Sequence, residues 1–232
     1  MMKLLAVIAL ALSLWAYPLA AKADCSGSGL AFTCDNTSTA AQISSAISSA
    51  SDTAVVTLEA GTYTLTGLID LTPRNGITVI CETVQACTLS RANDIFYLNP
   101  INTTITALTR ISGFILTGAV GTAKIWLFGQ NNIEKLRIDH NKFDMAAGSI
   151  AILIGGAGAD GVAYGVIDHN LFISTTGNFA ALSNIGGNGV AWPTGLLGLM
   201  RGRRRYWPEE QPSTPSTAAI LCTARFRGAP LY

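Results

Sequence analysis

One short stretch of the sequence decides the fold: LRIDHNKF at residues 136–143 recurs as VIDHNLF at residues 166–172. The two copies are 29 residues apart, and Phe114 lies another 29 residues before Phe143, after a turn that is two residues shorter. An apolar run precedes each full copy, KIWL at 124–127 and IAIL at 150–153. Self-similarity at this period, with several short strands in each unit, is typical of a solenoid.

The remaining sequence predicts many more short strands and one helix. Ile43 and Ile47, four residues apart among small residues, predict a helix over Thr39–Ala50 with Thr39 or Ser38 as its N-cap. Runs rich in β-formers predict strands at residues 55–58, 62–65, 68–71, 77–81, 95–98, 114–116 and 125–128, besides those of the repeat. Strands without intervening helices indicate an all-β fold. The repeat favours a right-handed parallel β-helix over a sandwich or a barrel.

Equivalent residues in successive coils of a β-helix stack about 4.8 Å apart along its axis. We therefore expect three stacked pairs, Ile138/Ile167, Asn141/Asn170 and Phe143/Phe172. The isoleucine and phenylalanine pairs would fill the interior. The asparagine pair would form a ladder whose side-chain amides satisfy backbone groups of the turn.

TAVVTLEAGTY at residues 53–63 resembles the opening coil of the pectate-lyase-like β-helix superfamily, and IDHN at 138–141 with its copy resembles the strand–turn segment of that superfamily. The resemblance covers residues 38–192. It implies that the predicted helix caps the open N-terminal end of the β-helix against edge pairing. The superfamily holds lyases, hydrolases, esterases, epimerases and non-enzymatic adhesins, so the resemblance does not choose a reaction.

Asp139-His140 and Asp168-His169 are the sharpest chemical candidates, because they contain both histidines of the chain. Stacked carboxylates can bind Ca²⁺, and one of a pair can be held protonated as a general acid. The resemblance implies the same metal, since pectate lyases carry a Trp-Ile-Asp-His segment whose Asp helps to bind calcium, and Asp139 or Asp168 matches it. We favour the alternative of a structural repeat, because catalysis needs one site and the motif occurs twice.

Trp126 and Trp192 are the candidate substrate-binding residues, since indole rings stack on sugars; packing in the core or at an end of the β-helix is their alternative role. The arginine motif of pectate lyases and the four motifs of polygalacturonase-like hydrolases are not found, so we assign no catalytic residue. We expect a truncated relative of lyases or hydrolases that act on acidic or plant-type polysaccharide. A non-enzymatic adhesive β-helix and an inactive product are the alternatives.

The N-terminus predicts export. Lys3, the apolar run over residues 4–16 and the Ala21-Lys22-Ala23 site together indicate a signal peptide at 1–23. A membrane anchor is the alternative, but the run is shorter than the ~20 residues of a spanning helix. A secreted protein, extracellular or periplasmic, meets an oxidising compartment. We therefore expect two disulfides, Cys25–Cys34 and Cys81–Cys87, because neither pair has the spacing of a metal-binding CxxC.

Charge and composition divide the chain. Residues 24–200 hold 7 Lys/Arg against 12 Asp/Glu, and this acidic balance argues against nucleic acid as a partner. We expect a cap at 24–52, β-helix coils at 53–192 and an Arg/Pro-rich tail at 193–232 that does not fold with them. RRRYWP at 203–208 stands where the next repeat is due. A basic binding tail is one explanation; we favour a shifted reading frame, which also accounts for the unpaired Cys222.

Overall fold

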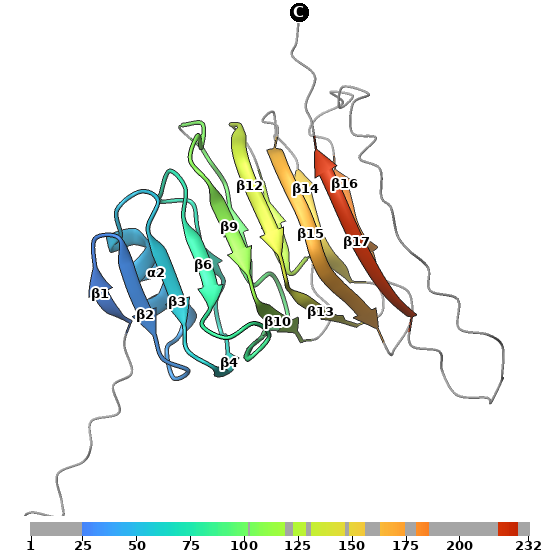
Figure 1. Ribbon diagram of the computed structural model, residues 1–232, viewed down its shortest axis with the longest axis horizontal. Helices are drawn as coiled ribbons and strands as arrows, with labels where there is room; N and C mark the ends of the chain where they lie inside the picture. Colours follow the sequence, from blue (N-terminus) through green and yellow to red (C-terminus); the bar gives the residue numbers. More distant parts are fainter. Residues whose placement is uncertain are drawn as a thin grey trace, which may run out of the picture.

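Successive segments of the chain pair in parallel with their equivalents one coil later, and the result is a β-helix of about five turns (Figure 1). The computed structural model describes residues 25–101, 103–118, 123–128, 131–146, 149–155, 163–174, 180–185 and 218–226. Within these residues the structure confirms the predicted all-β class, the parallel β-helix and the single short helix near the N-terminus.

Three parallel sheets run along the axis. The first contains β2 (Ala31–Cys34), β3 (Val55–Leu58), β6 (Thr78–Cys81), β9 (Thr109–Ser112), β12 (Ile133–Asp139) and the start of β15 (Ala163–Ser174). The second contains β4 (Gly61–Thr64), β7 (Cys87–Ser90), β10 (Phe114–Thr117), β13 (Lys142–Met145) and the end of β15. The third contains β5 (Ile69–Asp70), β8 (Phe96–Leu98), β11 (Ile125–Leu127), β14 (Ile150–Gly155) and β16 (Ala180–Ile185). Because β15 continues through the corner between the first two sheets, it belongs to both.

The predicted stacking inside the β-helix is confirmed. Ile138 lies opposite Ile167 in the first sheet, and Phe143 lies opposite Phe172 in the second. The two phenylalanine rings are nearly parallel, with centroids 4.7 Å apart. All four side chains are buried. Along most strands, inward apolar residues alternate with more exposed residues, and the inward residues build the core.

The prediction that aligned Phe114 with Phe143 was wrong. Leu116 lies opposite Phe143 instead, while Arg110 and Ile111 lie opposite Arg137 and Ile138. The turn between these strands is therefore not shortened in the earlier coil. Phe114 and Leu116 both point inward and both are fully buried, so the pattern of apolar residues alone fits either register. The phenylalanine packs against Phe96 of β8, with ring centroids 5.6 Å apart.

The corner between the first and second sheets is held by the predicted asparagine ladder. Asn141 and Asn170 are fully buried, and the Asn141 amide donates to the Asn170 Oδ1 atom over 3.1 Å. The Asn141 Oδ1 atom accepts from the Phe114 amide at 3.0 Å, and its Nδ2 atom donates to the Ile111 carbonyl at 3.0 Å. The side chain of one coil thus satisfies backbone groups of the coil before it.

The N-terminal end is covered by α2 (Ala40–Ser49). Thr39 is its N-cap and forms a capping box with Gln42. The helix buries Ala40, Ile43, Ala46 and Ile47. The Ser44 hydroxyl accepts from the backbone of Asp70 in β5 at 3.1 Å and donates to the carbonyl of Leu68. The helix therefore closes the edge of the third sheet, as a cap against edge pairing must.

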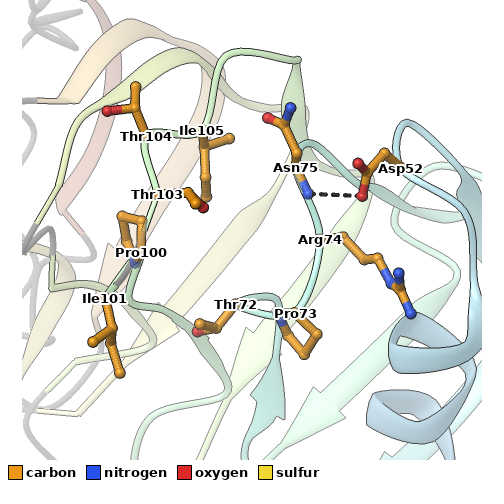
Figure 2. A pocket seen from close by; sticks show the side chains of 10 residues that line it. All are labelled: Asp52, Thr72, Pro73, Arg74, Asn75, Pro100, Ile101, Thr103, Thr104 and Ile105. Carbon is orange, nitrogen blue, oxygen red and sulfur yellow. Dashed lines mark hydrogen bonds between the residues drawn. The ribbon is translucent and has the colours of Figure 1, made fainter.

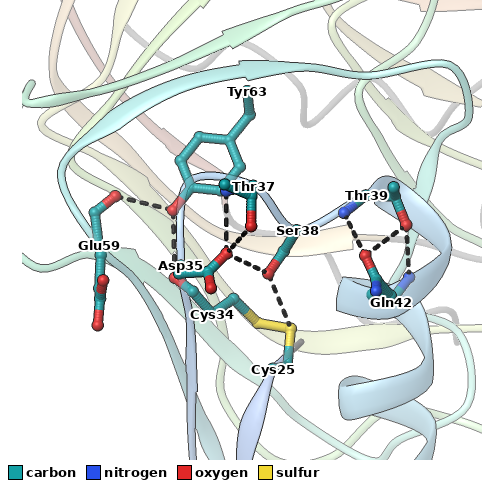
Figure 3. Close-up of a disulfide and its surroundings, with 9 residues drawn as sticks. All are labelled: Cys25, Cys34, Asp35, Thr37, Ser38, Thr39, Gln42, Glu59 and Tyr63. Atoms are coloured by element: carbon teal, nitrogen blue, oxygen red, sulfur yellow. Dashed lines mark hydrogen bonds between the residues drawn. A yellow bond between two sulfur atoms is a disulfide. The ribbon is translucent and has the colours of Figure 1, made fainter. Parts of the chain in front are cut away.

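Both predicted disulfides are present. Cys25 is bonded to Cys34, and Cys81 is bonded to Cys87. The first of them joins the two open ends of the antiparallel hairpin formed by β1 (Ser26–Ser28) and β2, since Cys25 directly precedes β1 and Cys34 ends β2 (Figure 3). Nearby, the buried Tyr63 hydroxyl donates to the carbonyl of Cys34 at 3.2 Å, and burial raises the pKa of this phenol. Two disulfides fit an oxidising compartment. No helix within the described residues is long and apolar enough to cross a membrane.

The tail contributes one described element. β17 (Ala218–Phe226) pairs with β15 and runs antiparallel to it, so it does not add a coil to the parallel winding. The tail is therefore not without structure along its whole length. The tail residues 193–217 and 227–232, like the predicted signal peptide, lie outside the described residues, as does Trp192. The shifted reading frame stays a prediction.

Asn141→Ala should lower the free energy of unfolding by about 3 kcal/mol, because it leaves the Phe114 N–H and the Ile111 carbonyl buried without partners. Urea unfolding at neutral pH measures this change. Asn93→Ala is the control, since Asn93 is exposed; it should change the free energy by less than about 0.5 kcal/mol. Equal effects of the two substitutions would contradict the stabilising role of the ladder.

Candidate functional site

The two Asp–His pairs lie where β12 and β15 turn from the first sheet into the second. Asp139 and Asp168 lie opposite each other in the parallel register. The Nδ1 atom of His140 lies 2.8 Å from the Asp139 carboxylate, and that of His169 lies 3.1 Å from the Asp168 carboxylate. The two imidazole rings stack 5.0 Å apart at an angle of 3°. The pairs are therefore adjacent steps of one ladder, as the repeat predicts.

Two arginines complete this cluster, and the sequence analysis missed them. The guanidinium of Arg110 donates to both oxygens of Asp139, at 2.8 and 2.6 Å. The guanidinium of Arg137 lies 3.5 Å from Asp139 and 3.3 Å from Asp168, and so bridges the two coils. Arg137 precedes Asp139 by two residues on one strand, so the two side chains share the outer face of the sheet. That period-two spacing was visible in the sequence.

The environment of Asp139 keeps its carboxylate ionised. Burial raises the pKa of this carboxyl, but hydrogen bonds from Arg110 and His140 and the charges of Arg110 and Arg137 outweigh burial, so the pKa lies below its ordinary value of 3.8. The hydrogen bond with Asp139 in turn raises the pKa of Arg110. A general acid needs a raised pKa, so Asp139 is not suited to that role.

The predicted calcium site does not fit the donor arrangement. The structure brings Asp139 and Asp168 together, but both oxygens of Asp139 already accept from Arg110. A calcium ion, which takes six to eight oxygen ligands, would have to displace a guanidinium. Within the described residues no group of three or more His, Cys, Asp or Glu side chains is arranged to hold a metal. The cluster is an ion-pair network on the surface of the corner.

A second surface lies on the outer face of the third sheet and includes Trp126, the one tryptophan candidate within the described residues. The Trp126 ring meets Tyr97 edge to face, with centroids 5.4 Å apart, and meets Phe128 at 5.6 Å. All three rings are partly exposed. The Trp126 Nε1–H donates to the Gly155 carbonyl at 2.9 Å, which fixes the orientation of the indole. We call Tyr97, Trp126 and Phe128 the aromatic patch.

An open pocket of about 600 Å³ lies where the strands of the third sheet end (Figure 2). Two loops from successive coils form most of it, one after β5 and one after β8, and Asp52 ahead of β3 completes the lining. Its lining consists of Asp52, Thr72, Pro73, Arg74, Asn75, Pro100, Ile101, Thr103, Thr104 and Ile105. Its volume lies within the range of about 300–1,000 Å³ that is usual for ligand pockets.

The charged groups of this pocket are engaged in structural contacts. Arg74 donates to the carbonyls of Ile47 and Ser48 at the end of α2, and Figure 2 shows its side chain directed toward that helix. Asp52 accepts from the backbone amide of Asn75 at 3.0 Å. The groups left to face a ligand are hydroxyls, proline rings and the Ile101 side chain, which is 53% exposed.

The aromatic patch and the pocket are connected by Asn99. Its Nδ2 atom donates to the Tyr97 hydroxyl at 3.0 Å, and its backbone amide donates to the Thr72 hydroxyl at 2.9 Å. The next residue, Pro100, lines the pocket. From the next coil, the Asn131 amide donates to the carbonyls of Pro100 and Ile101 and so holds the wall in place. The two features are therefore neighbours, and hydrogen bonds hold them in a fixed arrangement.

Comparison with known proteins does not identify a related family or structure. No protein-family model, curated protein or solved structure matches this chain. The parallel β-helix of the structure is the part of the resemblance to the pectate-lyase-like superfamily that is supported. Function has to be argued from the surfaces themselves.

Asp139→Asn should lower the free energy of unfolding near neutral pH by about 2–3 kcal/mol, because it removes charge-assisted hydrogen bonds from a buried carboxylate. The pKa of Asp139 is lowered in the folded state, so its contribution is present above the unfolded-state value of about 3.9 and is lost as pH falls through the folded-state value.

Urea unfolding of both proteins at a series of pH values measures this dependence. The difference between them should shrink as the pH is lowered from about 5 toward 2. Asp144→Asn is the control, since Asp144 lies on the neighbouring strand β13 outside the network. A difference that stays constant over this range would show that the carboxylate charge is not what stabilises the corner.

Proposed function

We propose that this protein is a secreted β-helix protein that binds polysaccharide along the outer face of its third sheet, over the aromatic patch and the adjoining pocket. The observation that carries the proposal is that three partly exposed aromatic rings lie next to an open pocket of about 600 Å³, to which Asn99 links them by hydrogen bonds. Aromatic faces and apolar walls stack on the C–H faces of sugars, while hydroxyl and amide groups fix their orientation.

The chemistry of the surface favours sugars without charge. The pocket offers the hydroxyls of Thr72, Thr103 and Thr104, and its two charged residues are held by contacts with the protein itself. Asp70 lies beside Tyr97 in the same outward column of the sheet, and a carboxylate there repels acidic sugars. The proposed ligand is therefore a neutral, hydroxyl-rich segment of a plant-type polysaccharide.

Binding, rather than bond cleavage, is the activity that these contacts support. A lyase or a hydrolase needs a base or an acid beside the reacting atoms. The residues that line the pocket include no His, Cys, Lys or Glu. The carboxylate of Asp52 accepts from a backbone amide, so it is committed to the loop. The proposal thus joins the expected polysaccharide partner with the non-enzymatic alternative.

Trp126→Ala should weaken the binding of a neutral oligosaccharide, such as a xylohexaose or galactan fragment, by about thirtyfold or more, since truncating a central aromatic residue of a binding site costs at least about 2 kcal/mol when it is a hot spot. Trp126→Phe keeps an aromatic face and should weaken it less. Isothermal titration calorimetry measures both affinities.

Leu30→Ala is the matched control, because Leu30 is an exposed apolar residue at the opposite, N-terminal end of the β-helix. It should leave the affinity unchanged. Unchanged binding in Trp126→Ala, with the thermal stability of the parent protein, would exclude the aromatic patch as the sugar-binding surface.

A further inference from the structure

The outward face of the second sheet carries small hydroxyl side chains in three successive coils. The strands β4, β7 and β10 each direct two side chains outward, one on either side of a buried residue. The parallel register aligns them in two columns, which are Thr62, Thr88 and Ile115 and, beside them, Thr64, Ser90 and Thr117. We call these six residues the hydroxyl face, because all of them except the isoleucine carry a hydroxyl group.

The hydroxyl groups of this face are available to a ligand. All six side chains are partly or fully exposed. Within the part of the chain that the structure describes, none of the hydroxyls has a hydrogen-bond partner. The hydroxyls of Thr37 and Thr72, which lie in loops, instead bond to neighbouring groups of the protein. The hydroxyl face therefore makes no hydrogen bond that stabilises the fold, although its threonines also suit a β-strand.

The hydroxyl face is free of charge and of aromatic rings. Its three coils place no Asp, Glu, Lys or Arg on the outward positions of β4, β7 and β10. Lys142 and Asp144 follow in the next coil, on β13, and mark where the face ends. An uncharged array matches an uncharged ligand, because charged side chains would hold hydration shells of their own. Without an aromatic ring, the face also lacks the stacking platform that sugars use on the third sheet.

The spacing of the array matches that of ordered water. Equivalent residues of neighbouring coils lie about 4.8 Å apart, and alternate residues of one strand lie about 6.7 Å apart. In a tetrahedral water network with hydrogen bonds of about 2.75 Å, two molecules that share a neighbour lie about 4.5 Å apart, and the perpendicular repeat of the hexagonal lattice is about 7.3 Å. The two sets of spacings agree to within about a tenth in both directions. Each hydroxyl both donates and accepts, as a water molecule does.

We propose that the hydroxyl face binds the surface of ice, so that the protein adsorbs to ice crystals and slows their growth. The hydroxyls of Thr62, Thr64, Thr88, Ser90 and Thr117 take positions close to those of lattice water molecules. The threonine methyl groups and the Ile115 side chain contribute apolar area, whose removal from liquid water favours adsorption. This activity is independent of the polysaccharide binding proposed for the third sheet, since it uses a different sheet and different residues.

Thermal hysteresis of the full chain, the gap between the melting and freezing temperatures of a single ice crystal, measures this activity. The parent protein should produce such a gap and should enter slowly growing ice. Thr88→Lys, at the centre of the first column, should abolish both effects, because the strongly hydrated ammonium group holds the crystal away from the neighbouring hydroxyls. Thr62→Lys makes the same change at a more exposed position of that column and should have the same effect.

Thr57→Lys is the matched control, since Thr57 is a partly exposed threonine on β3 of the first sheet. It should keep the thermal hysteresis of the parent protein, and all variants should keep its melting temperature. A parent protein without thermal hysteresis would overturn the proposal, as would equal loss of activity in Thr57→Lys and Thr88→Lys. A parent protein that leaves ice unaffected but binds microcrystalline cellulose, with that binding lost in Thr88→Lys, would assign the face to a polysaccharide instead.

Discussion

The coils depend on one constraint: the buried backbone groups at the corner between the first and second sheets must find hydrogen-bond partners. Each coil must turn there within a few residues, and the backbone groups of the turn lie in the interior, where an unpaired group is costly. Asn141 and Asn170 remove that cost because each offers a donor and an acceptor from one buried side chain. The residue before each asparagine adopts a left-handed conformation, and this bend aims the amide into the turn. The register of both sheets follows from the corner.

The sequence predicted the repeat-bearing part of this fold well, for a physical reason. Two copies of a motif at one offset specify which residues stack, so the pairs at Ile138, Asn141 and Phe143 followed directly. For coils that lack a copy of this motif, the sequence does not specify the register. Phe114 and Leu116 both fit the interior, so either could lie opposite Phe143. Hydrogen bonds at the corner, which the pattern of apolar residues does not reveal, place Leu116 there. The strands β2 and β7 were missed because they contain fewer β-branched and aromatic residues than β3 and β6, which have the same length and were predicted.

Less of the chemistry was predicted than of the fold. The Asp–His pairs were found because they repeat, but their meaning changed once Arg110 and Arg137 were placed beside them. An aspartate next to a guanidinium is a charged partner rather than a metal ligand or an acid. The pocket was not predicted at all. Its walls come from two loops that lie 25 or more residues apart in the sequence, and only the stacking of coils brings them together.

The position of the aromatic patch follows from the same architecture. In a β-helix every strand turns one side chain in two outward, and successive coils place equivalent outward residues in a column along the axis. Beside the corner, the outward columns of the first sheet contain arginine, serine and aspartate, whereas one outward column of the third sheet contains Asp70, Tyr97 and Trp126 in successive coils. The parallel register fixes the spacing of Tyr97 and Trp126 in successive coils, so a ligand over the aromatic patch would meet rings from both coils at a fixed distance without any movement of the chain.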